Sequence, residues 1–282
     1  MRLRATWTVF RFECSRTFNP QRLAAWLALA LFPAGLLALM QSQGAALEKG
    51  VQAGVAMFVL VPELTCVMGL LLWAAPVVCS ELEGRTWTYL AVSPAGKDSI
   101  MVGKYLTAIF WTILTAWISL SLAAMVVRPE KDAWRLWCVL AGLVPMSCLA
   151  YGALYVFFGV LFLKRAMVAA VAYTFVSEVL VSFIPAVINR ITVQYHLRSL
   201  LIKWMVVEPQ ITPRLAHGRV RPPSIEEIGW KDLAEQLSMS GQLDSNVAPW
   251  QHMLMLVIYA VTLLALAMVM LKRRELVLAD QT

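Results

Sequence analysis

The sequence is short of charged residues. Only 15% of its 282 residues are Asp, Glu, Lys or Arg, whereas soluble domains average about 25%. Hydrophobic residues make up 60% of the chain, which leaves too little polar surface to cover a soluble globule. We therefore expect lipid to contact much of the protein. The formal net charge of +7 is typical of Lys and Arg residues that flank membrane helices, and it does not favour a nucleic-acid partner.

Motifs for hydrolytic and metal chemistry are missing as well. The sequence contains no G-x-x-x-x-G-K-[ST], H-E-x-x-H or G-x-S-x-G. The cysteines form no C-x-x-C pair, and we interpret them as small buried side chains. The histidines, His196, His217 and His252, are too widely spaced to indicate a metal site. We expect a chain that is not itself an enzyme and that binds no metal or cofactor.

Six apolar stretches are long enough to cross a bilayer, which requires about 20 residues of helix. They cover residues 23–40, 54–79, 102–127, 134–163, 166–188 and 250–271. Several contain proline, which membrane helices tolerate because neighbouring helices satisfy the freed carbonyl groups. The predicted fold is therefore all-α: a polytopic membrane protein with six transmembrane helices.

Basic residues are concentrated on one side of these predicted spans. They are frequent in the N-terminal stretch 1–22, between the second and third spans, between the fourth and fifth spans, and in the tail 272–282. By the positive-inside rule, both termini of a protein of the inner (cytoplasmic) membrane would then be cytosolic. No signal-peptide pattern precedes the first span, so we expect that span to remain as an anchor.

The N-terminal stretch 1–22 has the pattern of an amphipathic surface helix. Trp7 and Phe10 recur at near-helical spacing, and Arg11 and Arg16 lie elsewhere on the same helix. Aromatic side chains would enter the acyl boundary while Arg faces anionic headgroups. The alternative is a charged tail that merely follows the positive-inside rule.

Residues 189–249 are predicted to lie outside the cytoplasm, because connections of about 60 residues cross the membrane largely regardless of charge. Within this segment, 194–204 could lie at the membrane surface or re-enter the membrane. Ser224 and Glu227 form a capping box before a short amphipathic helix. The segment could equally be a structured loop without a role of its own.

Residues 80–101 form a polar connection between the second and third spans, within the predicted transmembrane region 23–188. Glu81 and Glu83 suit the first turn of a helix, Leu90 belongs to its apolar side, and Pro94 ends it. The pattern predicts a short helix held against the cytosolic face, where a soluble partner could press on it.

This connection resembles the cytosolic signature of type-2 ABC transporter permeases. The residues that match the family pattern, in order, are Glu81, Glu83, Thr86, Leu90, Pro94, Lys97, Gly103 and Lys104. The order of surface helix, six spans and a larger outer connection before the last span also fits that family. Arg85 departs from the pattern, because members often carry a small residue there.

The resemblance implies a coupling helix. In such exporters a separate cytosolic ATPase dimer, which binds ATP and Mg²⁺, presses on this helix and on the surface helix, and two permease subunits form the transport path. Leu90 would dock into the ATPase, and Lys97 and Lys104 would anchor the helix at the headgroups. Glu81 and Glu83 would pair with Arg11 or Arg16. The competing interpretations are a non-transporting scaffold, a channel subunit and an intramembrane enzyme.

Two carboxylates fall within the predicted spans. Glu178 lies near the middle of the fifth span, and Glu63 lies in the outer part of the second. An intramembrane carboxylate usually faces the bundle interior or a water-filled cavity. Glu178 is thus the first candidate for lining a translocation path, and Glu63 is the second. The alternative is a neutral carboxyl bonded between helices.

Overall fold

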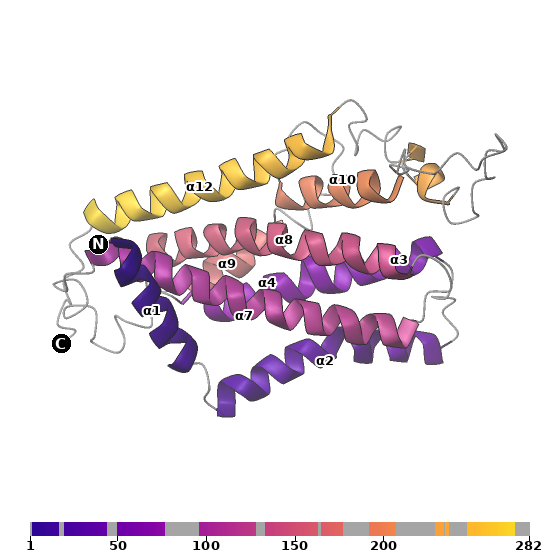
Figure 1. Ribbon diagram of the computed structural model, residues 1–282, viewed down its shortest axis with the longest axis horizontal. Coiled ribbons are helices and arrows are strands. Elements are labelled where there is room, and N and C mark those ends of the chain that lie inside the picture. Colours follow the sequence, from indigo (N-terminus) through magenta and orange to yellow (C-terminus); the bar gives the residue numbers. More distant parts are fainter. Residues whose placement is uncertain are drawn as a thin grey trace.

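The computed structural model describes the following residues: 2–16, 20–43, 50–76, 96–127, 133–162, 165–176, 192–206, 229–233, 235–236 and 247–273. Most of the predicted coupling connection, residues 80–95, lies outside this part, as do Glu178 and residues 274–282. Within the described ranges every regular element is a helix, as the apolar composition predicts (Figure 1).

The described helices are α1 (Arg2–Arg16), α2 (Pro20–Ser42), α3 (Gly50–Phe58), the π-helix η1 (Val59–Thr65), α4 (Cys66–Trp73), α7 (Gly96–Val127), α8 (Ala133–Leu161), α9 (Ala166–Thr174), α10 (Val193–Val206) and α12 (Pro249–Arg273). Helices α3, η1 and α4 follow one another without a break. Figure 1 shows that α7, α8 and α12 run side by side along the length of the molecule.

Five of these helices are long and apolar enough to cross a membrane. They are Arg22–Ser42, Val51–Trp73, Asp98–Val127, Ala133–Leu161 and Pro249–Arg273, and they correspond to five of the six predicted spans. The remaining predicted span, 166–188, starts as α9, and its residues from 177 onward lie outside the described part. The total of six therefore stays a prediction.

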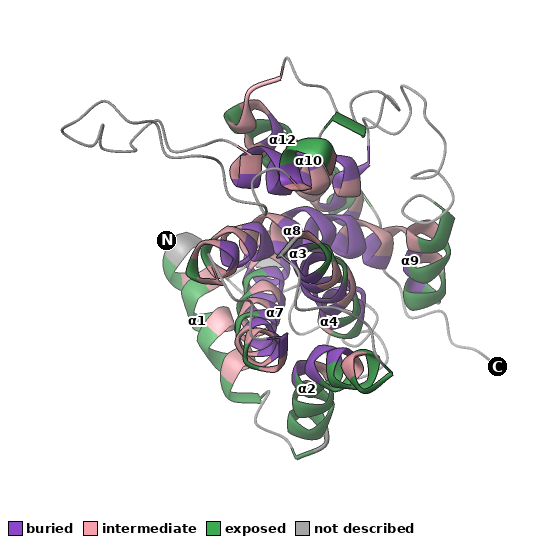
Figure 2. Cartoon of the chain, turned by 90° about the vertical axis from the view of Figure 1, so that its right-hand side faces the viewer, coloured by how far each residue is buried: buried purple, intermediate pink, exposed green. Residues whose placement is uncertain are grey.

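Helix α8 occupies the centre of the bundle (Figure 2). It contacts α4, α7, α9, α10 and α12. Within its most apolar stretch 72% of the residues are buried, against 22% in α2 and in α12. A helix that is apolar on all sides is stable only where other helices or lipid surround it, so α8 forms the core. The exposed apolar faces of α2 and α12 are those expected to contact lipid.

Glycines let the helices around α8 approach closely. A Cβ atom on Gly159 would lie 2.5 Å from the carbonyl oxygen of Ala75, just after α4. A Cβ atom on Gly152 would lie 3.1 Å from the ring of Tyr105 on α7. Small residues at such crossings replace side-chain volume with direct backbone contact, as is common between membrane helices.

The π-helix η1 interrupts the second candidate span around Pro62. Proline has no backbone N–H and disturbs the helical ladder at this point. Two side-chain hydroxyls bond carbonyls within this turn: Ser147 on α8 donates to the Pro62 carbonyl at 2.6 Å, and Thr65 donates to the Leu60 carbonyl at 2.8 Å. Single π-turns inside longer helices occur frequently at functional sites.

Helix α10 packs into the bundle beside α8 and α12. Its 14 residues span only ~21 Å, shorter than the ~30 Å hydrocarbon core. At its C-terminal end, the guanidinium of Arg135, from the start of α8, donates to the carbonyls of Trp204 and Met205 at 3.3 and 3.0 Å. The C-terminal end of α10 therefore lies level with the first turn of α8.

Candidate functional site

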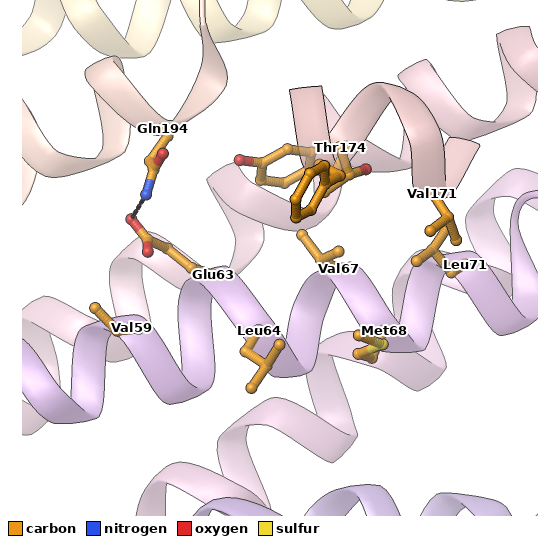
Figure 3. A pocket seen from close by; sticks show the side chains of 11 residues that line it. Val59, Glu63, Leu64, Val67, Met68, Leu71, Val171, Thr174 and Gln194 are labelled. Carbon is orange, nitrogen blue, oxygen red and sulfur yellow. Dashed lines mark hydrogen bonds between the residues drawn. The ribbon is translucent and has the colours of Figure 1, made fainter. Parts of the chain in front are cut away.

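A cavity of about 350 Å³ lies between the second candidate span and helices α8, α9 and α10. Most of its wall is aliphatic, with Val67, Leu71 and Val171 among the lining side chains. The polar exceptions include Glu63 and Gln194, which face each other at one end of the cavity (Figure 3). An apolar cavity with a few convergent polar groups is the usual form of a small-molecule site.

Glu63 is the charged side chain of this wall. The amide Nε2 of Gln194 donates to its Oε1 at 2.9 Å. The candidate span runs from Val51 to Trp73, so twelve residues precede Glu63 and ten follow it. The predicted span 54–79 placed Glu63 in its outer part, whereas the structure places it near the middle. A carboxyl at this depth is costly unless it is hydrogen-bonded, and Gln194 supplies that bond.

Local structure explains how Glu63 reaches the cavity. It directly follows Pro62 within η1, where the wider π-turns change the direction of side chains relative to an α-helix. Its partner comes from the N-terminal turn of α10, a segment that sequence analysis placed in the long connection before the last span. Glu63 and Gln194 are 131 positions apart, and no sequence pattern links them.

A contact between α8 and α9 adjoins the cavity, because Thr174 of α9 belongs to its lining. The Thr174 hydroxyl donates to the Ala170 carbonyl at 2.8 Å, so the Tyr155 hydroxyl, 2.8 Å away, donates to Thr174. Thr174 thus fastens α9 to the central helix.

A second arrangement joins α1 to the start of α7. Lys104 is only 9% exposed and forms an ion pair with Glu13, with Nζ 3.4 Å from Oε1. This differs from its expected position at the lipid headgroups. The Thr107 hydroxyl lies 3.5 Å from the Phe10 carbonyl, and a Cβ atom on Gly103 would lie 2.8 Å from the Val9 side chain. Helix α1 therefore packs closely on α7.

The side chains of α1 divide between this contact and an outward face. Phe10, expected in the acyl boundary, packs edge-on against Phe110 of α7, with ring centroids 5.8 Å apart. Trp7 is 64% exposed, and Arg11 and Arg16 are exposed as well. The outward face thus combines an aromatic ring with basic groups, while the single acid of α1, Glu13, points to α7.

The remaining predicted coupling residues lie beside this contact in the sequence. Lys97 belongs to the first turn of α7. The others, Glu81, Glu83, Thr86, Leu90 and Pro94, lie outside the described residues, so their predicted roles stay predictions. The connection that carries them leads directly into the helix on which α1 packs.

A third polar cluster was missed from the sequence. His196 on α10 and His252 on α12, considered too far apart for a common site, have their Nδ1 atoms 3.0 Å from each other. Lys203 Nζ lies 3.2 Å from His252 Nε2. The one available signal was the spacing of His196 and Lys203, seven residues apart and thus on one helical face. Within the described residues, no group of three or more His, Cys, Asp or Glu side chains has a metal-binding arrangement.

No protein-family model matches the chain, and no curated protein is significantly similar to it.

Proposed function

We propose that this chain is the membrane-spanning permease subunit of an ATP-driven ABC exporter of the inner membrane. A separate cytosolic ATPase dimer would act on it through residues 80–101, and a second permease subunit would complete the transport path. Both termini would be cytosolic. The chain would contribute the path by alternating access and would bind no ATP or Mg²⁺ itself.

The observation that carries this proposal is the contact between α1 and α7. The connection that resembles the ABC coupling helix leads into α7 at Gly96. Eight residues further on, the Lys104–Glu13 ion pair and the close approach of Gly103 to Val9 join α7 to α1. Force applied to the connection would therefore be transmitted to both helices as one body, as rigid-body switching requires. A scaffold or a simple channel has no need for such a lever.

The cavity beside Glu63 would form a section of the path. It lies next to the central helix and is bounded by a π-helical turn, where the second span can bend. Helix α10 would re-enter the membrane to about half its depth, bringing Gln194 to Glu63. Non-helical or interrupted backbone at this depth is tolerated where it is buried in protein or lines a cavity.

The test is co-purification from mild detergent. Tagged wild-type chain is expected to bring down a Walker-motif ATPase in stoichiometric amount. Glu81→Lys/Glu83→Lys should lose that ATPase or uncouple its hydrolysis from transport. A matched control, Asp232→Lys/Glu235→Lys, reverses two exposed acids far along the chain and should behave as wild type. If no ATPase is recovered in several detergents, the exporter proposal fails and the scaffold, channel and enzyme interpretations return.

A further inference from the structure

Three basic side chains meet where α10 passes the first turn of α12. His252 is 2% exposed and Lys203 is 9% exposed. The Nδ1 atoms of His196 and His252 are 3.0 Å apart, and Lys203 Nζ lies 3.2 Å from His252 Nε2. The Lys203 ammonium also donates to the Val247 carbonyl, just before α12. Together these bonds fasten α10 to α12.

The donors and acceptors of this cluster follow from its chemistry. An ammonium group has three donors and no acceptor, so Nε2 of His252 must accept a hydrogen bond from Lys203. Neutral His252 then carries its proton on Nδ1 and donates it to Nδ1 of His196. His196 must in turn carry its own proton on Nε2. The order of donation is therefore Lys203 to His252 to His196, and it requires both histidines to be neutral.

A metal ion does not fit this arrangement. A metal-ligating histidine turns its other ring N–H toward an acceptor such as a carboxylate or a carbonyl. With a metal on Nδ1, Nε2 of His252 would instead direct an N–H at the Lys203 ammonium, 3.2 Å away. The geometry suits a hydrogen-bond relay.

Protonation breaks the relay at either histidine. A proton added to His196 Nδ1 sets two N–H groups against each other, and a proton added to His252 Nε2 sets an N–H against the ammonium of Lys203. Histidine is the side chain that ordinarily changes charge between about pH 5 and about pH 8. The contact is thus complete at pH values above the range in which the two histidines take up protons. It is lost as the pH falls through that range.

Among the described residues, the other charged groups that face α10 keep their bonds during this change. Glu63 faces it from η1, and Gln194 Nε2 can donate to a carboxyl oxygen in either protonation state. Arg135 faces it from α8 and donates to the carbonyls of Trp204 and Met205. Arg198 belongs to α10 itself. Within the described part of the chain, acidification therefore acts on the contact with α12.

We propose that His196, His252 and Lys203 form a proton-sensitive latch, which holds α10 against α12 at neutral pH and releases it on acidification. The latch is a property of the fold and can be tested without a transport assay. Any influence on the cavity, through Gln194 on the same helix, rests on the proposed transport function. In the proposed orientation the latch lies toward the outer face, at the end of α12 opposite Lys272.

Hydrogen–deuterium exchange of the full chain in lipid nanodiscs tests the latch. Exchange of residues 192–206 is compared at about pH 7.5 and about pH 5, after correction for the pH dependence of intrinsic amide exchange. In wild type, the corrected exchange rate should rise at least about ten-fold at the lower pH, which corresponds to the loss of one hydrogen bond to a charged group. The exchange rate of residues 133–161 of α8 should stay unchanged. His196→Gln/His252→Gln should abolish the step, and the control His217→Gln should retain it.

Three results would overturn the proposal: no step in wild type, the same step in the double variant, or a parallel rise in α8. If the double variant does not fold, ¹⁵N-histidine NMR of the wild type decides. At neutral pH it should show His252 protonated on Nδ1 and His196 on Nε2, with further protonation at the pH of the exchange step. Other tautomers, or protonation without faster exchange of α10, would refute the latch.

Discussion

The ion pair between Lys104 and Glu13 offers a quantitative test of the contact between α1 and α7. Their side chains are 9% and 15% exposed, and the charged atoms are 3.4 Å apart. Breaking a fully buried pair costs about 3–5 kcal/mol, whereas exposed pairs contribute about 0.2–1 kcal/mol. For this well-shielded pair we expect a coupling free energy of about 1–2 kcal/mol, measured with Glu13→Gln, Lys104→Met and the double variant.

A second ion pair in the same chain is the matched control. Lys272 Nζ lies 2.8 Å from Asp98 Oδ2, but the two side chains are 57% and 25% exposed. If distance alone decided the strength of an ion pair, this pair would be the stronger. Because solvent screens exposed charges, we expect its coupling free energy to be about 0.5 kcal/mol or less.

The assay is a double-mutant cycle on the free energy of unfolding, followed by tryptophan fluorescence in mixed micelles as SDS is added. The reasoning is refuted if the effects of Glu13→Gln and Lys104→Met add within about 0.3–0.5 kcal/mol. It is refuted equally if the Lys272–Asp98 pair couples more strongly. Under the proposed function, the variants that release α1 should also lower transport-coupled ATP hydrolysis.

Three further changes test the packing, a thiol and the cavity. Gly159→Ala places a Cβ 2.5 Å from a carbonyl oxygen and should destabilise the protein by about 1–3 kcal/mol. Gly35→Ala meets nothing within 4 Å and should stabilise the protein by up to about 1 kcal/mol. Equal shifts in Tm for the two variants would contradict the close approach at Gly159. Burial raises the pKa of the Cys14 thiol above its usual 9.0, so maleimide labelling followed by mass spectrometry should still accelerate at pH values where a free cysteine has levelled off; a matching profile would contradict this. Glu63→Gln keeps an acceptor for Gln194 and should leave Tm nearly unchanged, yet lower substrate-stimulated ATPase activity of the complex roughly ten-fold; full activity would remove Glu63 from the path.

The candidate spans were predictable because the requirement for them is local. A stretch of about 20 apolar residues satisfies its own backbone hydrogen bonds as a helix and needs no distant partner to enter lipid. Arg22–Ser42 and Pro249–Arg273 accordingly lie within two residues of the predicted boundaries. The second span is shifted, from 54–79 to Val51–Trp73, because the apolar run continues past the point where the helix ends.

The faces that helices present to one another were harder to predict. The amphipathic pattern of α1 indicates that one face is more apolar than the other. An aromatic face can pack against lipid or against another helix, and the pattern does not distinguish the two. Phe10 packs on Phe110 because Gly103 leaves room for α1 to approach α7. Lys104 could have reached the headgroups by extending its long side chain, but the approach of Glu13 offered it a partner.

The sequence alone determined the helical class and the expectation of a lipid environment, because these depend on composition. It also determined that each intramembrane polar group needs a partner, because an unpaired polar atom is costly in an apolar surrounding. Only the tertiary structure decided which partner each group has. Glu63 meets Gln194 across 131 positions, and His196 meets His252 across 56. Such pairs form where helices cross, and the crossing points are set by glycines, a proline-bearing π-turn and side-chain volume summed over the whole bundle.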